Sequence, residues 1–316
     1  MNTRQPKTKT RAVPALLLGI SALLASGCNG DDMSADVNTS TLQLGITDAP
    51  LDSATRVWVQ FTGVEVKPSG GPVQSFAFNP AKGFDLLTLQ NGNAAVLLGD
   101  STVAAGEYEW IRLLVDPAPG SSYIVDATGQ HDLRIPSGLE TGLKLVRGFT
   151  MPAGGRGDFT IDFVLGKSII APPGQSPNYM MKPVLRLTDN TQVGTLAGVF
   201  NPQTLAAQPA CANRAPTIYL YTGVVTTPDD LYNPVNDSAD TMPTVDPLVT
   251  ATAALVSGQY AYRIGFVPVG SYTVAFTCNN DDPLVDENTL VPNPITFTLY
   301  PQAVSIAAGM TTTANF

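Results

Sequence analysis

The chain has 316 residues, of which 44% are hydrophobic and 14% are charged, and its formal net charge is −9 at pH 7. Without the export segment predicted at its N-terminus, 13 basic residues remain against 26 acidic ones, a net charge of −13. A nucleic-acid partner needs a basic binding surface, so this composition excludes one. After that segment, no apolar run is long enough to cross a membrane.

The first 27 residues predict an export signal. Four basic residues precede an apolar run from Ala12 to Ala25, which is too short to span a bilayer as a stable helix. The run ends in LLASGC, and this Cys after small residues resembles the bacterial lipobox, although Ala25 stands where Leu is usual. The resemblance implies cleavage before Cys28 and acylation, including palmitate, of the new N-terminus. The alternative is an ordinary secretory signal with an incidental Cys.

The segment after Cys28 predicts a membrane location and a flexible linker. Asn29 stands where an Asp commonly retains such lipoproteins in the inner membrane, so the resemblance implies an outer-membrane anchor, facing the periplasm or the cell surface. Residues 28–40 are polar and lack aromatic side chains, which is typical of a disordered tether. Membrane contact is therefore expected through acyl chains alone.

Residues 41–190 predict an all-β domain. Short alternating segments are separated by Gly, Pro, Asn and Asp, which is typical of an antiparallel sandwich or barrel. Gly63 shifts the apolar alternation and predicts a bulge, and residues 84–89 fit either a strand or a helical turn. The predicted strands are Thr41–Ile46, Arg56–Val66, Val73–Phe78, Tyr108–Val115, Tyr123–Val125, His131–Ile135, Leu143–Phe149, Asp158–Leu165 and Tyr179–Leu187.

Seven motifs in this domain occur in the order of a known family. They are LGITDAPLD, VWVQFTGVEV, FDLLTLQNG, GEYEWIRLLV, IPSGLETGLKL, IDFVLGKSI and NYMMKPVLRL, between Leu44 and Leu187. The domain resembles bacterial domain-of-unknown-function family 4382, found on exported lipoproteins. Val164 stands where the family more usually has an Asp. The family has no established activity, so the resemblance implies a location and a shape, not a reaction.

Residues 191–316 predict a second β-sandwich. The segments GTLAGVF, TIYLYTGVV and GQYAYRIGFVPVGSYTVAFTC precede a closing ITFTLYPQAVSIAAGMTTTANF. This order resembles the carboxypeptidase regulatory-like, transthyretin-like sandwich; an immunoglobulin-like sandwich is the alternative. In an oxidising compartment, Cys211 and Cys278 remain as a possible disulfide once Cys28 is acylated. Two free buried thiols and a two-Cys metal site are the alternatives.

Five polar residues of the family-like motifs form a predicted network. Lys144 and Lys182 lie within apolar strands, so each either faces solvent or pairs with a buried acid such as Asp48. Asp48 before Ala-Pro also suits a turn. The interpretation favours structural pairing of Asp48 and Lys144 over a ligand site. The candidates are Thr47, Asp48, Ser137, Lys144 and Lys182.

The sequence contains few of the residue patterns that catalytic sites require. His131 is the only His, so an imidazole metal site or a His-based triad has little support, and no Gly-x-Ser-x-Gly motif occurs. Asp158 and Asp162 are predicted to share a strand face, as paired carboxylates require. No cofactor is expected. Two acidic loops allow calcium as a hypothesis, with solvated loops as the alternative; the candidate ligands are Asp229, Asp230, Asp281, Asp282 and Asp286.

These patterns predict a lipid-anchored cell-envelope protein with a non-enzymatic binding or structural role. The alternative is a carboxylate-dependent hydrolase acting on envelope glycan or peptide, and converging carboxylates in a deep cleft would favour it. A shallow surface with exposed aromatic rings, such as Trp58 or Trp110, would favour binding of a glycan or an envelope protein.

Overall fold

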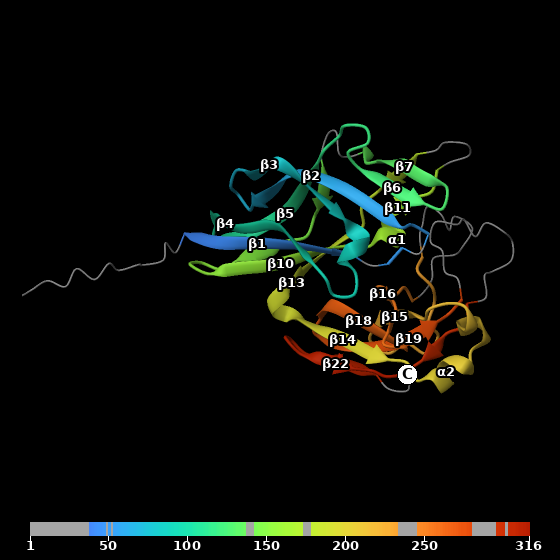
Figure 1. Cartoon of the computed structure of the whole chain (residues 1–316). Coiled ribbons are helices and arrows are strands. Elements are labelled where there is room, and N and C mark those ends of the chain that lie inside the picture. Colours follow the sequence, from blue (N-terminus) through green and yellow to red (C-terminus); the bar gives the residue numbers. More distant parts are fainter. Residues whose placement is uncertain are drawn as a thin grey trace, which may run out of the picture. The chain divides into compact units, whose positions relative to one another are not determined.

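The computed structural model describes residues 38–48, 50–51, 53–136, 142–172, 178–232, 245–279, 295–300 and 303–316. The predicted signal peptide, Cys28, most of the predicted tether and four site candidates (Ser137, Asp281, Asp282 and Asp286) lie outside these ranges. Strands dominate the described chain (Figure 1), which confirms the predicted all-β class. No helix within these ranges is long and apolar enough to cross a membrane.

A four-stranded sheet contains the first strand of the chain. β1 lies between β10 and β4, and β13 forms the edge beyond β10 (Figure 1). β1 runs parallel to β10, with Thr47 opposite Asp162, whereas the other two pairs are antiparallel. The strands are β13 (Leu185–Asp189), β10 (Arg156–Phe163), β1 (Thr39–Asp48) and β4 (Ala95–Ala104).

A nine-stranded sheet faces the first one across a shared core. Its main path is β11-β12-β7-β6-β2-β5-β8, with β3 paired to β2 and β9 paired to β5. The helical turns η1 (Leu86–Leu89) and α1 (Leu165–Ser168) follow β3 and β10. The strands are β2 (Arg56–Pro68), β3 (Gln74–Asp85), β5 (Gly106–Val115), β6 (Tyr123–Asp126), β7 (Gly129–Arg134), β8 (Leu143–Leu145), β9 (Phe149–Met151), β11 (Ile169–Ile170) and β12 (Tyr179–Met181).

Alternating side chains build the core between these two sheets. Leu42, Leu44 and Ile46 of β1 are fully buried, as the two-residue period of a strand requires. The predicted bulge is present at Gly63, where the register shifts against both neighbouring strands. A Cβ at Gly63 would lie 2.6 Å from the Phe76 carbonyl oxygen, so glycine allows β2 and β3 to approach closely here.

The strands after η3 (Asn190–Gln192) form two further sheets. One has the order β17-β18-β14-β22, and the other has the order β16-β15-β19-β20, with β21 also paired to β19. β14 and β22 are parallel, and the remaining pairs are antiparallel. The strands are β14 (Val193–Val199), β15 (Thr217–Thr222), β16 (Val249–Thr252), β17 (Ala254–Val256), β18 (Gln259–Pro268), β19 (Gly270–Thr277), β20 (Thr298–Leu299), β21 (Val304–Ile306) and β22 (Thr311–Thr313).

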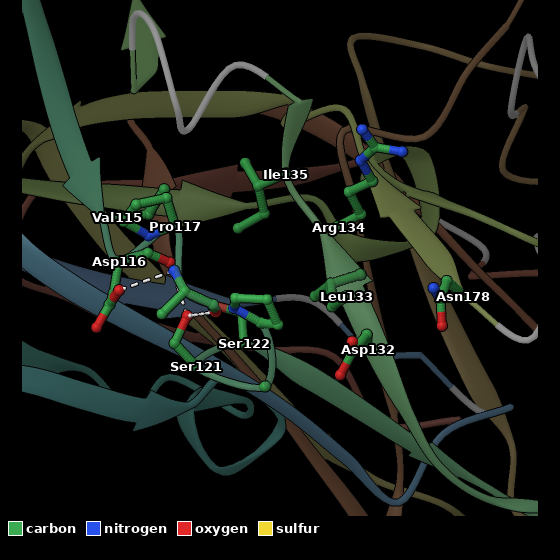
Figure 2. A pocket seen from close by; sticks show the side chains of 13 residues that line it. Val115, Asp116, Pro117, Ser121, Ser122, Asp132, Leu133, Arg134, Ile135 and Asn178 are labelled. Carbon is green, nitrogen blue, oxygen red and sulfur yellow. Dashed lines mark hydrogen bonds between the residues drawn. The ribbon is translucent and has the colours of Figure 1, made fainter.

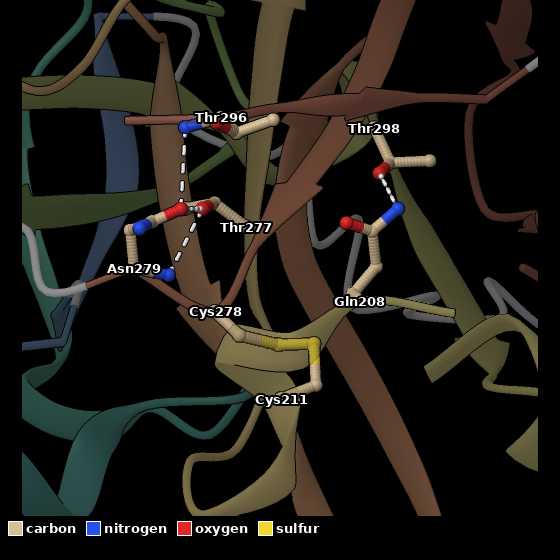
Figure 3. Close-up of a disulfide and its surroundings, with 7 residues drawn as sticks. All are labelled: Gln208, Cys211, Thr277, Cys278, Asn279, Thr296 and Thr298. Atoms are coloured by element: carbon tan, nitrogen blue, oxygen red, sulfur yellow. Dashed lines mark hydrogen bonds between the residues drawn. A yellow bond between two sulfur atoms is a disulfide. The ribbon is translucent and has the colours of Figure 1, made fainter. Parts of the chain in front are cut away.

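Aromatic rings pack between these two sheets, and a disulfide ties a helical turn to the end of one strand. The Phe200 ring lies 5.0 Å from that of Phe276 and 5.3 Å from that of Phe316, centroid to centroid. Cys211 lies in η4 (Pro209–Ala212), which follows α2 (Pro202–Ala206), and is bonded to Cys278 just after β19 (Figure 3). Their Cα atoms are 5.0 Å apart. The predicted disulfide is confirmed.

Candidate functional site

An open hollow of about 340 Å³ lies on the first pair of sheets, between the β5–β6 loop and the end of β7 (Figure 2). The loop contributes residues 115–122 on one side, and β7 with the residue after it contributes Asp132–Ile135 on the other. Asn178, just before β12, also lines it. The volume is within the range of small-molecule sites in proteins.

Hydrogen bonds within the β5–β6 loop fix that wall of the hollow. The Asp116 Oδ1 atom accepts from the Ala118 N–H at 2.9 Å, and the Ser121 hydroxyl is 2.6 Å from the Ala118 carbonyl oxygen. The Ser122 carbonyl accepts from the Leu133 N–H at 3.1 Å, which joins the loop to β7. Pro117 and Pro119 restrict the backbone further. These bonds hold the loop wall in place against β7.

Two opposite charges on β7 border the hollow. Asp132 and Arg134 are two residues apart, so they lie on the same face of the strand, and both are exposed. Within the described chain, neither side chain forms an ion pair or a side-chain hydrogen bond. The hollow thus presents an acceptor group and a donor group that the fold does not use.

His131 faces a different set of partners. The Asp126 carboxylate accepts from the Thr128 N–H and hydroxyl, each at 2.7 Å, and from the Tyr179 hydroxyl at 2.7 Å. His131 Nε2 is 3.2 Å from Asp126 Oδ1 and 2.8 Å from the Thr128 hydroxyl. Desolvation raises the pKa of Asp126, but the bonds from Thr128 and Tyr179 and the nearby His131 outweigh it and hold that pKa below its ordinary value. These contacts hold the β6–β7 turn.

The predicted polar network is dispersed over the fold. The Thr47 hydroxyl is 2.9 Å from the Leu89 carbonyl oxygen and 2.7 Å from that of Asn93, so it anchors the segment after η1. Asp48 is 6% exposed at the end of β1. Lys182 is exposed just after β12. Thr47 and Asp48 are therefore adjacent buried residues at the end of β1, where Thr47 has a structural role. Lys182 faces solvent.

The predicted pairing of Lys144 with Asp48 is wrong. Lys144 lies on the exposed face of β8, with its Nζ atom 4.6 Å from the centroid of the Trp110 ring. The Arg112 guanidinium is also 4.6 Å from that ring and pairs with Glu65 at 2.9 Å. The alternation of β8 buries Leu143 and Leu145 and turns the lysine outward, onto an indole ring.

The aromatic side chains considered for ligand stacking are largely covered. Trp110 is 9% exposed beneath Arg112 and Lys144. Trp58 is half-buried; its ring stacks with that of Tyr123 at 6.2 Å and packs over Gly83, where a Cβ would lie 2.1 Å from the indole. Neither ring lines the hollow.

The two carboxylates predicted on one strand face have separate partners. Asp162 pairs with Arg186, whose Nη1 atom also donates to the Leu248 carbonyl at 3.1 Å. Asp158 accepts from the Asn190 amide at 2.7 Å. The alternation of β10 puts both carboxylates on one face as expected. However, Arg186 of β13 binds one of them and Asn190 of η3 binds the other. The sequence reasoning missed Arg186, whose only signal is its position in an alternating segment.

The calcium hypothesis finds no support in the described residues. The Asp229 carbonyl accepts from the Tyr221 hydroxyl, and the Asp229 carboxylate accepts from the Asp230 N–H at 3.1 Å. Within the described ranges, no group of three or more His, Cys, Asp or Glu side chains is placed to hold a metal ion. Asp281, Asp282 and Asp286 lie outside those ranges.

The fold and the hollow together define an all-β protein with an opening of small-molecule size. Residues 39–183 match the family described as "Domain of unknown function (DUF4382)", which confirms the resemblance of the first predicted domain. None of the curated proteins compared with the chain matches it.

Several solved structures are similar at low identity. A leucine-rich repeat protein from Bacteroides thetaiotaomicron has 11% identity and a TM-score of 0.24; the match covers 88% of this chain and 26% of that one, so the chain spans about a quarter of its length. A predicted cell adhesion protein from Parabacteroides distasonis has 11% identity, 84% coverage of both chains and a TM-score of 0.20. The fimbrial anchor protein Mfa2 from Porphyromonas gingivalis has 10% identity, coverage of 84% and 99%, and a TM-score of 0.19. Scores this low identify neither the fold nor the function.

Proposed function

We propose that this chain is a non-enzymatic, lipid-anchored protein of the bacterial cell envelope that binds a ligand in the hollow beside β7. The observation that carries the proposal is the pair Asp132 and Arg134: two exposed charges at the rim of an opening, neither paired within the described chain. Buried charges need partners, as Asp162 and Arg186 have here, whereas Asp132 and Arg134 are exposed and leave their groups open to a ligand. Unmatched charges of both signs around an opening suit recognition.

The serine hydroxyls near the hollow are occupied by structural contacts, which supports binding over serine-dependent catalysis. Ser121 is hydrogen-bonded within its own loop, and the Ser122 hydroxyl accepts from the Gln60 N–H at 3.3 Å. A serine nucleophile needs a base within hydrogen-bond reach, but His131 is bound to Asp126 and Thr128. The described lining residues therefore present no serine nucleophile with a histidine base.

The envelope location and the lipid anchor rest on the sequence. Basic residues, a short apolar run and small residues before Cys28 form the expected order of a lipoprotein signal. The acidic balance of the remaining chain makes nucleic acid an unsuitable partner. Acylation at Cys28 would hold the β-sheet regions near the outer membrane, where the hollow could meet an envelope glycan or protein.

The proposal is tested by affinity capture with a matched variant. Mature protein, solubilised in detergent, is immobilised and exposed to envelope extract, alongside a variant carrying Asp132→Ala and Arg134→Ala and a control carrying Lys144→Ala. The wild type and the control should retain a component that the double variant loses. Equal retention by all three proteins would show that the hollow is not the binding site.

A further inference from the structure

We infer that the hollow takes a neutral saccharide, with hydroxyl groups of a sugar ring between Asp132 and Arg134. The inference rests on the proposed function and names the ligand class of the same site. Its basis is the combination of opposite charges, apolar walls and a wall that hydrogen bonds hold in place.

The charges around the hollow are of both signs, so neither an anion nor a cation meets attraction alone. Asp116 and Asp132 stand on opposite walls and would repel an anion, which the acidic balance of the whole chain also repels. Arg134 stands beside Asp132 on β7, and its charge offsets that of Asp132 and weakens the attraction of the hollow for a cation. A ligand without net charge is subject to neither effect, and it can still use both kinds of group.

Hydroxyl groups fit this mixture because each one both donates and accepts. A carboxylate such as Asp132 only accepts, and the Arg134 guanidinium only donates, through a planar fork that can contact two neighbouring oxygens. Asp116 adds a second acceptor, since its Oδ1 atom takes one loop N–H and its other oxygen has no partner within the described chain. Hydroxyl groups of a saccharide can therefore pair with groups of both kinds.

The remaining lining suits the apolar faces of a sugar ring. Pro117 and Pro119 belong to the loop that lines the hollow, and Ile135 lies across from Pro117 (Figure 2). Apolar walls with a few placed polar groups are the usual composition of small-molecule sites. The loop is fixed by its own hydrogen bonds, so binding loses little conformational entropy.

The test titrates detergent-solubilised mature protein with defined probes by calorimetry. The neutral probes are cellotriose, maltotriose and triacetylchitotriose; the charged probes are trigalacturonate and trilysine. The variants are Asp132→Asn and Arg134→Gln, and Arg147→Gln is the matched control at an exposed arginine away from the hollow. Thermal melts of all variants should equal that of the wild type, because each changed side chain is exposed.

At least one neutral trisaccharide should bind saturably, and each hollow variant should weaken it roughly tenfold or more, the effect of losing one hydrogen bond to a charged group. The Arg147→Gln protein should bind as the wild type does. Binding of trilysine or trigalacturonate alone, lost in the hollow variants, would overturn the saccharide inference and leave the proposed binding function intact. If no probe binds, the inference fails; the capture experiment then decides separately whether the hollow binds anything.

Discussion

Arg186 donates a hydrogen bond from Nη2 to the Asp162 carboxylate, and the two side chains are only 17% and 5% exposed. They stand directly opposite each other on β13 and β10. Burial raises the pKa of the Asp162 carboxyl, and the Arg186 guanidinium opposes that rise. Each member of the pair therefore neutralises the charge of the other, and either charge would be costly to bury alone.

Removing one member of this pair should destabilise the protein strongly. Asp162→Ala should lower the free energy of unfolding by about 3–5 kcal/mol, because it leaves the guanidinium largely buried without its carboxylate. The double variant Asp162→Leu with Arg186→Met should recover much of that loss, since it removes both charges. Urea denaturation near neutral pH measures all three proteins.

The exposed pair of Asp100 and Arg156 supplies the control. Their nearest atoms are 2.7 Å apart, but the side chains are 61% and 45% exposed. Asp100→Ala should therefore leave the urea midpoint unchanged within error. If Asp162→Ala also left the urea midpoint unchanged, the buried pair would contribute no more to stability than the exposed pair does.

Acid should weaken the β6–β7 turn through Asp126. Its folded pKa lies below the ordinary value of 3.8, so its stabilising contribution is complete above that value and is lost as the pH falls toward the folded pKa. Asp126→Asn should lower the melting temperature at about pH 6 and flatten its dependence on pH below about 5. Thermal melts across this range check the effect. Asp132→Asn is the control, because it changes an exposed carboxylate, and it should keep the wild-type dependence of melting temperature on pH. If Asp126→Asn also kept that dependence, Asp126 would not be the group that stabilises the turn.

The strands that alternation predicted are those with one clearly buried face. β1 follows the two-residue period of burial as far as Leu44, and all its residues from there to Asp48 are buried. β2 follows that period except at Gly63, where the change in alternation predicted the bulge. β4 was missed because Leu97 and Leu98 are both buried and its register against β1 shifts, so its sequence has no regular period. Residues 143–149 were predicted as one strand, but β8 ends at Leu145 and the separate strand β9 begins at Phe149.

The candidate site depended on contacts that a single sequence does not contain. The β5–β6 loop meets the end of β7 because β6 and β7 pair, and no sequence pattern marked that contact. Lys144 was paired with Asp48 because both lie near apolar residues, yet they belong to different sheets. Charge types could be read from the chain, but strand register decided which charges meet.

The proposed anchor makes a prediction about fractionation. Cys28→Ser should release the protein from the membrane fraction, because stable anchoring depends on more than one acyl chain at that residue. Mass spectrometry of the wild type should find an acylated N-terminal Cys28. Asn29→Asp is the companion variant, and it should move the protein to the inner membrane without releasing it. Sedimentation of Cys28→Ser with membranes, or an unmodified Cys28, would contradict the anchor.

Loss of the Cys211–Cys278 bond should loosen the later pair of sheets selectively. The bond joins residues 67 positions apart and ties η4 to the end of β19 (Figure 3). The chain-entropy model gives a loop of this length about 4 kcal/mol. In a variant carrying Cys211→Ala and Cys278→Ala, hydrogen exchange should therefore accelerate in β15 and β19, while β1 and β2, in the other core, keep their protection. Non-reducing peptide mapping of the wild type should recover the linked pair. Equal acceleration in both cores would mean that they unfold as one cooperative unit, and no acceleration in either would mean that the bond is dispensable.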